Sequence, residues 1–187
     1  MTAPTLSPFT SPPALTPFSA PLSGYLASNP TISHLLVSAV ILTPHQPSKS
    51  ATTTPRPAKV LLVQRAATDG FPLLWECPGG NVDTSDSTIL HALQREVFEE
   101  TGLAMTRVIE LFDGGVEFQW GEGRCRKLTF LVMVDDEVRG EGTGVVLNPE
   151  EHVDFVGRRR GMCRRGCARG GRSILRMKSR GRWCWGC

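Results

Sequence analysis

The fold is decided by one stretch of the chain, GGNVDTSDSTILHALQREVFEETG, which spans residues 79–102. It opens with a glycine pair, where a turn is expected, and continues through a polar loop. Apolar residues then recur at spacings of three and four, which predicts a helix over residues 88–102. The apolar stripe consists of Ile89, Leu90, Leu93 and Val97. Gly102 stands where helices commonly end in a left-handed residue. The candidates for the N-terminal cap are Asp86, Ser87 and Thr88.

Three glutamates of this helix, Glu96, Glu99 and Glu100, are separated by three and four positions and therefore share one face. By themselves they are also typical of a solvated acidic helix face. Their context favours a metal site, because the loop after the glycine turn brings backbone carbonyls and carboxylates to one point. Hard oxygen ligands grouped in this way suit Mg²⁺ or Mn²⁺, whose charge relieves the repulsion among the carboxylates.

From Gly80 onward the sequence resembles the Nudix box, which is a glycine, five residues, a glutamate, seven residues and then Arg-Glu-aliphatic-any-Glu-Glu-any-Gly-aliphatic. Residues 95–103 match the second half at every position. The first half departs twice: Asp86 stands where the family has glutamate, and eight residues instead of seven separate it from Arg95. The extra residue falls in the loop or the first helical turn, so it does not rotate the three glutamates. The resemblance covers about residues 34–156.

The resemblance implies an α/β (α+β) fold in which a mixed β-sheet is sandwiched between helices. It also implies a metal-dependent pyrophosphohydrolase whose substrate is a small nucleoside diphosphate linked to another moiety. Such a diphosphate is polyanionic, so Mg²⁺ or Mn²⁺ must bridge it to the glutamates and activate water. By matching motif positions, the resemblance assigns the metal to Glu96, Glu99 and Glu100. Which diphosphate is bound depends on loops outside the motif.

Catalytic roles fall to the same helix. Either Glu96 or Glu99 takes the proton of the attacking water, and the family does not fix which. A backbone carbonyl at Gly79 or Gly80 is expected to help to hold the metal and the substrate. Arg95 is expected to pair with Glu99 one turn further on and to hold it in place.

Several residues outside the helix are candidate site residues, and each has a functional and a purely structural interpretation. Trp75, just before the glycine turn, either stacks on a substrate base or packs in the core. Glu150 and Glu151 lie in a late loop, where one of them either adds a carboxylate to the site or belongs to an exposed acidic turn. His152 by itself supports no role. Phosphate contacts and an exposed strand edge are both consistent with Arg124, Arg126 and Lys127.

Composition divides the 187 residues into three parts, with room for one domain and its tails. Residues 1–33 carry no Lys, Arg, Asp or Glu and are rich in proline, serine and threonine, which predicts a disordered leader without helix. Residues 34–156 are the expected Nudix domain. Its predicted strands are residues 34–42, 59–64, 107–112, 116–120 and 127–134, with an exposed loop at 43–58.

The basic tail, residues 157–187, holds 11 basic and no acidic groups, whereas the residues before it hold 10 basic and 18 acidic groups. It lacks the apolar stripe of the helix that closes a Nudix domain, so that C-terminal helix is expected to be missing or replaced. The tail is predicted to be a disordered basic arm, a zinc module that binds nucleic acid, or the product of an altered reading frame, which its abrupt composition favours. The zinc ligands would be Cys163, Cys167, Cys184 and Cys187.

Two functional hypotheses follow. The first is the hydrolase, and the second is a catalytically impaired Nudix scaffold that binds nucleic acid through its basic tail. The intact Arg95–Glu100 segment favours the first, because a scaffold used only for binding has no need of three crowded carboxylates. Nucleic acid is otherwise not expected as a partner, and the sequence indicates no oligomeric state.

Cytoplasmic location is expected. No signal or transit peptide is recognised, and the longest apolar run, Leu35–Leu42, is far shorter than the roughly 20 residues that cross a bilayer. Two scattered cysteines before the tail, Cys77 and Cys125, fit a reducing compartment.

Overall fold

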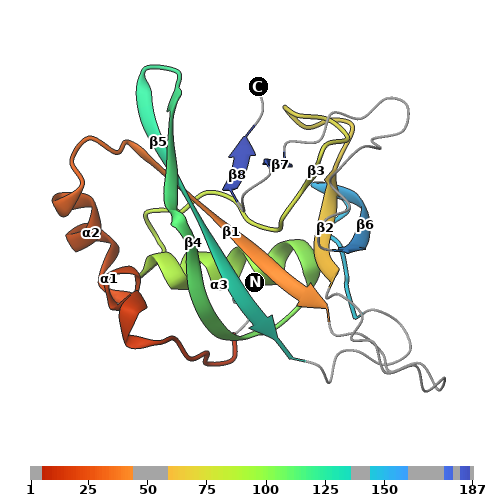
Figure 1. Ribbon diagram of the computed structural model, residues 1–187, viewed down its shortest axis with the longest axis horizontal. Coiled ribbons are helices and arrows are strands. Elements are labelled where there is room, and N and C mark those ends of the chain that lie inside the picture. Colours follow the sequence, from red (N-terminus) through yellow and green to blue (C-terminus); the bar gives the residue numbers. More distant parts are fainter. Residues whose placement is uncertain (1–5, 44–58, 136–143, 160–174, 179–181, 186–187) are drawn as a thin grey trace.

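The computed structural model describes residues 6–43, 59–135 and 144–159, together with the backbone of two short strands at 175–178 and 182–185 (Figure 1). Its elements, in chain order, are η1 (Pro13–Leu15), α1 (Thr16–Ser19), α2 (Leu22–Ser28), β1 (His34–Thr43), β2 (Lys59–Arg65), β3 (Trp75–Glu76), α3 (Ile89–Thr101), β4 (Met105–Trp120), β5 (Gly123–Val134), β6 (His152–Arg159), β7 (Leu175–Lys178) and β8 (Arg182–Trp185). All but the first residue of the expected loop at 43–58 lies outside the described residues.

Six strands form one mixed sheet with the order β3-β2-β1-β5-β4, and β6 pairs with β2. β1 and β5 run parallel, whereas the other paired strands are antiparallel. The predicted mixed sheet is therefore confirmed. The strands predicted at 107–112 and 116–120 are parts of one long strand, β4, whose ladder with β5 is irregular between Phe112 and Val116. Gly114 and Gly115, both with positive φ, allow that irregularity without ending the strand.

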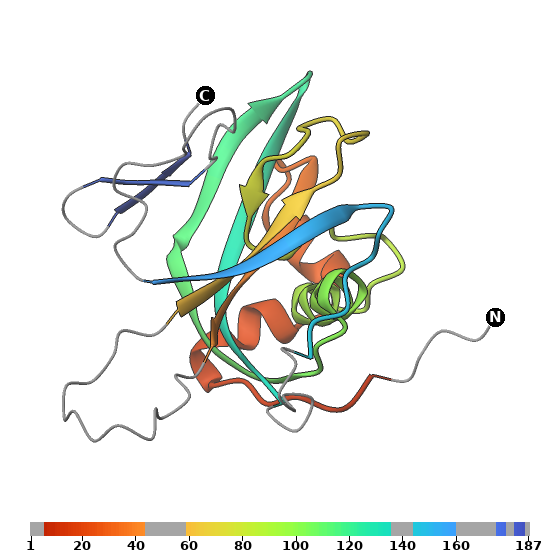
Figure 2. The same ribbon diagram turned by 90° about the vertical axis from the view of Figure 1, so that its right-hand side faces the viewer.

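The helices α1, α2 and α3 pack on one face of the β1–β5 part of the sheet (Figure 2). Alternate residues of β1, such as Val37 and Ala39, point to this face and bury against the apolar stripe of α3. The main core contains the α3 residues Ile89, Leu90, Ala92, Leu93 and Val97. The opposite face carries a smaller cluster of Val40, Leu62 and Cys77, and Trp75 packs against it.

Residues 6–33 differ from the disordered leader that the composition predicts. Leu15 and Leu22 are buried in the main core, and Phe18 packs edge-to-face on Phe130 of β5. This uncharged segment therefore covers part of one face of the sheet.

The expectation that prolines exclude helix here was wrong, because the prolines stand at helix starts. Pro13 is the first residue of η1, Pro17 is the second residue of α1, and Pro21 is the N-cap residue of α2. At these positions a helix does not use the N–H group that proline lacks.

Gly24 provides a test of α2. An added Cβ at Gly24 meets nothing within 4 Å, and the residue lies inside the helix. Gly24→Ala should therefore raise the free energy of unfolding by about 0.5–1 kcal/mol, measured by urea denaturation. As a control, Gly121→Ala should lower it, because Gly121 has φ +58°. An unchanged midpoint for Gly24→Ala would mean that residues 22–28 are not helical in solution.

The sheet extends beyond the expected end of the domain at Val156. β6 pairs with β2 as far as Arg159, opposite Lys59, and a strand at a sheet edge tolerates such charged residues. Within the described part of the chain no helix follows α3, and no helix is long and apolar enough to span a membrane. Cys163, Cys167 and Cys187 lie outside the described residues. The backbones of β7 and β8 form a separate antiparallel pair.

Candidate active site

The glycine turn is held along β1 by three backbone hydrogen bonds. They are Val37 N–H to Gly80 O (2.9 Å), Ala39 N–H to Pro78 O (2.7 Å) and Val82 N–H to Leu35 O (2.9 Å). Gly79 has φ +146°, and a Cβ there would lie 2.2 Å from the carbonyl oxygen of Val37. Only glycine fits so close to a neighbouring strand.

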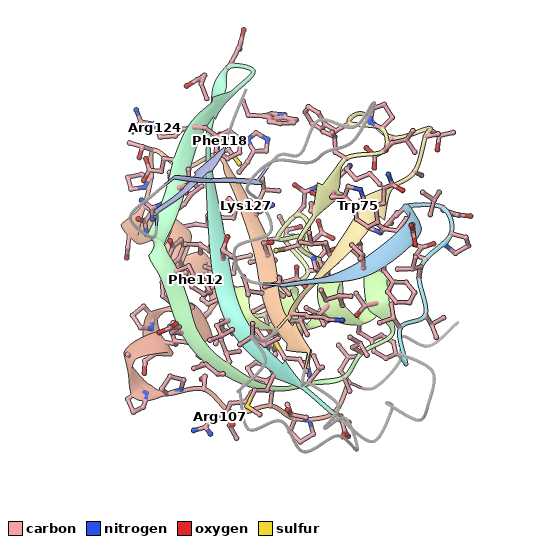
Figure 3. The ribbon with its side chains drawn as sticks, turned by 45° about the vertical axis from the view of Figure 1, so that its right-hand side comes forward. Trp75, Arg107, Phe112, Phe118, Arg124 and Lys127 are labelled. Carbon is pink, nitrogen blue, oxygen red and sulfur yellow. The ribbon has the colours of Figure 1, made fainter. Side chains whose placement is uncertain are left out.

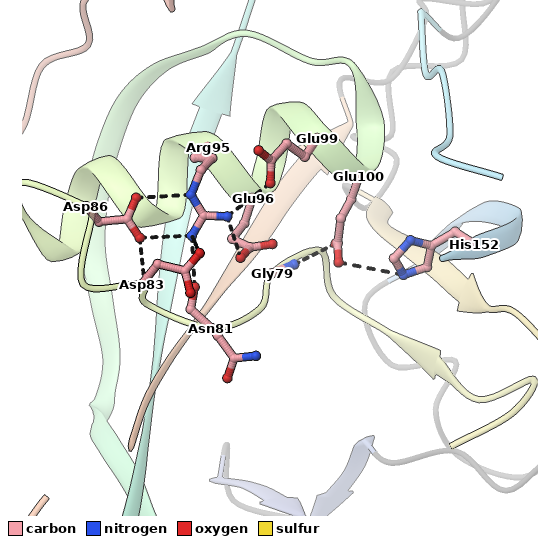
Figure 4. A network of polar contacts seen from close by, with 9 residues as sticks. All are labelled: Gly79, Asn81, Asp83, Asp86, Arg95, Glu96, Glu99, Glu100 and His152. Atoms are coloured by element: carbon pink, nitrogen blue, oxygen red, sulfur yellow. Dashed lines mark hydrogen bonds and ion pairs between the residues drawn. The ribbon is translucent and has the colours of Figure 1, made fainter. Parts of the chain in front are cut away.

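The same turn lies directly against α3. A Cβ at Gly80 would lie 2.7 Å from a carboxylate oxygen of Glu96. The Gly79 N–H donates a 2.7 Å hydrogen bond to Glu100 Oε2 (Figure 4). The glycine pair therefore brings backbone into contact with two of the three predicted carboxylates.

Helix α3 begins and ends as predicted. The Thr88 hydroxyl accepts a hydrogen bond from the N–H of His91, which caps the first turn. Gly102 adopts φ +68° and its N–H donates to Phe98 O at 2.8 Å. With its apolar stripe buried, the helix turns Glu96 and Glu100 toward the glycine turn (Figure 4). Glu99 lies on the same side of the helix and turns toward Arg95.

Arg95 is the centre of a polar network around the loop and the helix (Figure 4). Its Nε and Nη2 donate to the two carboxylate oxygens of Asp86 at 3.0 and 2.9 Å. Its Nη1 donates to Glu96 at 2.9 Å and to Glu99 at 3.0 Å, and its Nη2 also donates to the carbonyl of Asn81 at 2.9 Å. The predicted pair of Arg95 with Glu99 is present, and the guanidinium also binds the loop before α3 through Asn81 and Asp86.

Burial raises the pKa of two of the three glutamates. It raises the pKa of Glu96 to about 7, although Arg95 opposes the shift. It raises the pKa of Glu100 to about 9, although the Gly79 N–H opposes it, and the neighbouring carboxylates add to the rise. Glu99 is more open, with 51% of its side chain exposed. Two partly desolvated carboxylates side by side favour binding of a proton or a cation.

These shifts predict how stability depends on pH when divalent metal is removed with EDTA. Glu96 and Glu100 have pKa values in the folded protein that lie above those in the unfolded chain. Their contribution to the free energy of unfolding is therefore fully present below about pH 4.5 and is lost as the pH rises through about 7 and about 9. Between pH 5 and 8 the free energy of unfolding should fall, by at most about 1.4 kcal/mol per pH unit for each group. Urea midpoints across this range measure it. Glu100→Gln should flatten the slope, and a free energy that rises with pH would contradict the assignment.

Glu76 and His152 join the site from β3 and β6, and sequence reasoning missed both. His152 Nε2 lies 3.8 Å from Glu100 Oε1 and 3.9 Å from Glu76 Oε1. Burial alone would raise the pKa of Glu76, but His152, Lys127 and Arg65 outweigh it and the pKa lies below its ordinary value. The only available signal for Glu76 was a glutamate between Trp75 and Cys77 in a short apolar strand.

The three basic residues of β5 have different surroundings in the structure. Lys127 is buried, and burial lowers its pKa while Glu76 and Glu100 oppose that shift. The strand-edge alternative is therefore wrong for Lys127. Arg124, at the start of β5 (Figure 3), and Arg126 instead pair with Glu117 on the neighbouring strand, at 3.4 Å and 3.1 Å.

Of the two candidate glutamates in the loop before β6, only Glu151 lies close to helix α3. Carboxylate and imidazole atoms of Glu100, Glu151 and His152 all lie within 4.8 Å of one another. Glu150 is exposed in the turn after Asn148 and is not part of that group. Trp75 is half-buried against the smaller apolar cluster, so it packs in the core while part of its surface stays open.

The sequence model of the NUDIX domain matches residues 44–159, which is more than half of the chain. The chain belongs to the Nudix family. In this Nudix domain the two departures from the box have a structural explanation. Asp86 accepts a hydrogen bond from the N–H of Asp83 at 2.8 Å and closes a turn that takes up the extra residue. The shorter carboxylate thereby still reaches Arg95.

Among the solved structures to which this chain is similar are three from E. coli, Shewanella oneidensis and Methanosarcina mazei. The E. coli ORF135 protein is 24% identical and covers 70% of this chain and 76% of its own, with a TM-score of 0.50. The NUDIX domain of Shewanella oneidensis NrtR, solved with ADP ribose, is 22% identical, with 74% and 82% covered and a TM-score of 0.51. The MutT protein of Methanosarcina mazei Go1 is 24% identical, with 67% and 76% covered and a TM-score of 0.48. No curated protein matches the chain.

Proposed function

We propose that this Nudix domain hydrolyses the diphosphate linkage of a nucleoside diphosphate joined to another moiety, with a divalent metal ion. The observation that carries the proposal is the convergence of carboxylates at the glycine turn. Glu96 and Glu100 lie against it, Glu99 shares their helix face, and Glu151 approaches from the late loop. Such crowded carboxylates are useful where a cation and a polyanion must be held together.

The donor set fits Mg²⁺ or Mn²⁺, because both ions bind carboxylate, carbonyl and water oxygens. The raised pKa values of Glu96 and Glu100 support this, because burial disfavours their charged forms and a bound cation would offset that cost. Glu96, Glu99 and Glu100 would hold the ion. The carbonyl of Gly79 would assist more readily than that of Gly80, which already accepts from Val37. The bound ion would neutralise phosphate charge and lower the pKa of water.

The protein side chains would position the reactants and move one proton. Arg95 holds Glu96 and Glu99 in fixed orientations. One of these two carboxylates accepts the proton of the attacking water. Trp75 of β3 is only half-buried and would stack on the base of the substrate.

The hydrolase unit would include the leader as well as residues 34–156. Leu15 and Leu22 lie in the main core, and β6 continues to Arg159.

A cytoplasmic location fits the scattered cysteines Cys77 and Cys125.

A second candidate function is binding of nucleic acid through the tail, residues 157–187. Its 11 basic groups without any acidic group favour this. Affinity of the full chain for a DNA or RNA oligonucleotide should then fall steeply between 50 and 200 mM salt, by roughly 10³-fold or more if six phosphates are contacted. Affinity that is weak at low salt and insensitive to added salt would exclude it.

The direct test of the proposed function is a panel of diphosphates with the full chain and Mg²⁺. The panel contains ADP-ribose, which the NrtR NUDIX domain binds in its crystal, together with a nucleoside triphosphate, a nucleotide sugar, a dinucleoside polyphosphate and coenzyme A. Chromatography of the products identifies the bond that is cut. Turnover of one class supports the proposal and names the substrate. A folded chain that turns over none of them would count against it.

A further inference from the structure

The imidazole of His152 is the least explained polar group in the described part of the chain. His152 is 3% exposed, and neither ring nitrogen has a hydrogen-bond partner among the described residues. Buried polar side chains nearly always have such a partner, because leaving water without one is costly. A buried imidazole that makes no hydrogen bond to the described residues, and whose contacts to Glu76 and Glu100 are as long as 3.9 and 3.8 Å, therefore points to a ligand.

The surroundings of His152 match the geometry of a shared ion. Its Nε2 lies 3.8 Å from Oε1 of Glu100, too far for a hydrogen bond (Figure 4). Two atoms that each lie about 2.0–2.2 Å from one metal ion are roughly 3–4 Å apart. Glu151 supplies a third donor, since the three donor atoms lie within 4.8 Å of one another.

Backbone contacts fix these donors before any ion binds. The Gly79 N–H holds Oε2 of Glu100, which leaves Oε1 toward the histidine. The N–H groups of Glu151 and His152 both donate to the carbonyl of Asn148, at 3.2 and 2.8 Å. The Val146 N–H donates to Thr101 O at 2.9 Å and ties the late loop to the last turn of α3, so the donors are held in place as a metal site requires.

The other carboxylate near His152 is already engaged. Glu76 accepts a hydrogen bond from Arg65 and lies close to Lys127. The charge left to balance a cation therefore comes from Glu100 and Glu151, which together match a divalent ion.

We propose that Glu100, Glu151 and His152 bind one divalent first-row transition-metal ion, with His152 as its nitrogen ligand. The inference rests on the proposed function, because Glu100 also belongs to that metal site, and it names the class of metal. Mn²⁺, a first-row transition-metal ion, accepts an imidazole nitrogen beside carboxylate oxygens, whereas Mg²⁺ prefers an all-oxygen shell. This chain should accordingly bind Mn²⁺ more tightly than Mg²⁺ at this position.

The test measures metal binding without substrate. Mn²⁺ is the probe, because it is paramagnetic and because the tail cysteines, as soft ligands, compete poorly for it. Pulsed EPR of Mn²⁺ with the full chain should show coupling to a directly bound ¹⁴N nucleus. His152→Gln should abolish that coupling and weaken Mn²⁺ binding at least about tenfold, while Mg²⁺ binding should change less than about threefold. His34→Gln, at an exposed histidine, is the matched control and should change neither.

Folding of each variant is checked by circular dichroism. If His152→Gln does not fold, Glu151→Gln provides the second variant, because Glu151 is exposed, and it should weaken Mn²⁺ binding by a similar factor. Absence of nitrogen coupling in the full chain overturns the nitrogen ligand even if Mg²⁺-dependent hydrolysis is observed. Nitrogen coupling that His152→Gln removes supports it, even if every diphosphate of the panel is left intact, which would count against the proposed function alone.

Discussion

Glu99→Gln should lower kcat for the best diphosphate substrate by about 10²–10⁴-fold, because the substitution removes a charge from the metal and proton-acceptor face of α3. Glutamine has nearly the same shape, and 51% of the Glu99 side chain is exposed, so the fold should be unaffected. Steady-state kinetics at saturating Mg²⁺ measure the effect, with thermal unfolding as the check on folding. Glu96→Gln should give a loss of the same order, and the larger loss would identify the proton acceptor.

The matched control is Glu110→Gln. Glu110 is an exposed glutamate of β4, away from the glycine turn. This variant should keep kcat and KM within about twofold, since exposed substitutions of this kind rarely disturb a structure. Equal activity of Glu99→Gln and the full chain would remove the box helix from the chemistry.

Gly79→Ala should lower the free energy of unfolding by roughly 3 kcal/mol or more. Its Cβ would lie 2.2 Å from the Val37 carbonyl oxygen and 2.6 Å from the Ser38 Cα, and the clash is with backbone that cannot rotate away. The left-handed φ of +146° adds strain. Urea denaturation followed by circular dichroism measures the change.

Gly70→Ala is the comparison for this prediction. An added Cβ at Gly70 meets nothing within 4 Å, so the midpoint should move little. A Gly79→Ala variant as stable as Gly70→Ala would show that the glycine turn does not lie against β1 as described.

The helix and its network could be predicted because their signals are local. The stripe around Leu93, the cap and Gly102 are all readable within one segment, and Arg95 reaches Glu99 one turn away. Asp86, the bidentate partner of Arg95, was harder to predict. The turn that presents Asp86 depends on its carboxylate, which accepts a hydrogen bond from the N–H of Asp83.

The rest of the candidate site depends on pairings between distant segments. Glu76 and His152 meet Glu100 only because β2 pairs with both β3 and β6. No spacing in the sequence carries that information. The leader was mispredicted for another reason, since composition does not reveal that Pro17 and Pro21 stand at helix starts.

The most direct test of metal-dependent hydrolysis is ³¹P NMR of the full chain with ADP-ribose, or with whichever diphosphate of the panel is cleaved fastest. The chain is first freed of metal with EDTA, and Mg²⁺ is then added in excess. We expect no reaction in EDTA, and after Mg²⁺ the diphosphate resonances should be replaced by those of the two phosphate products. Turnover that is equally fast in EDTA, or its absence in a folded chain that binds Mg²⁺, would contradict the account.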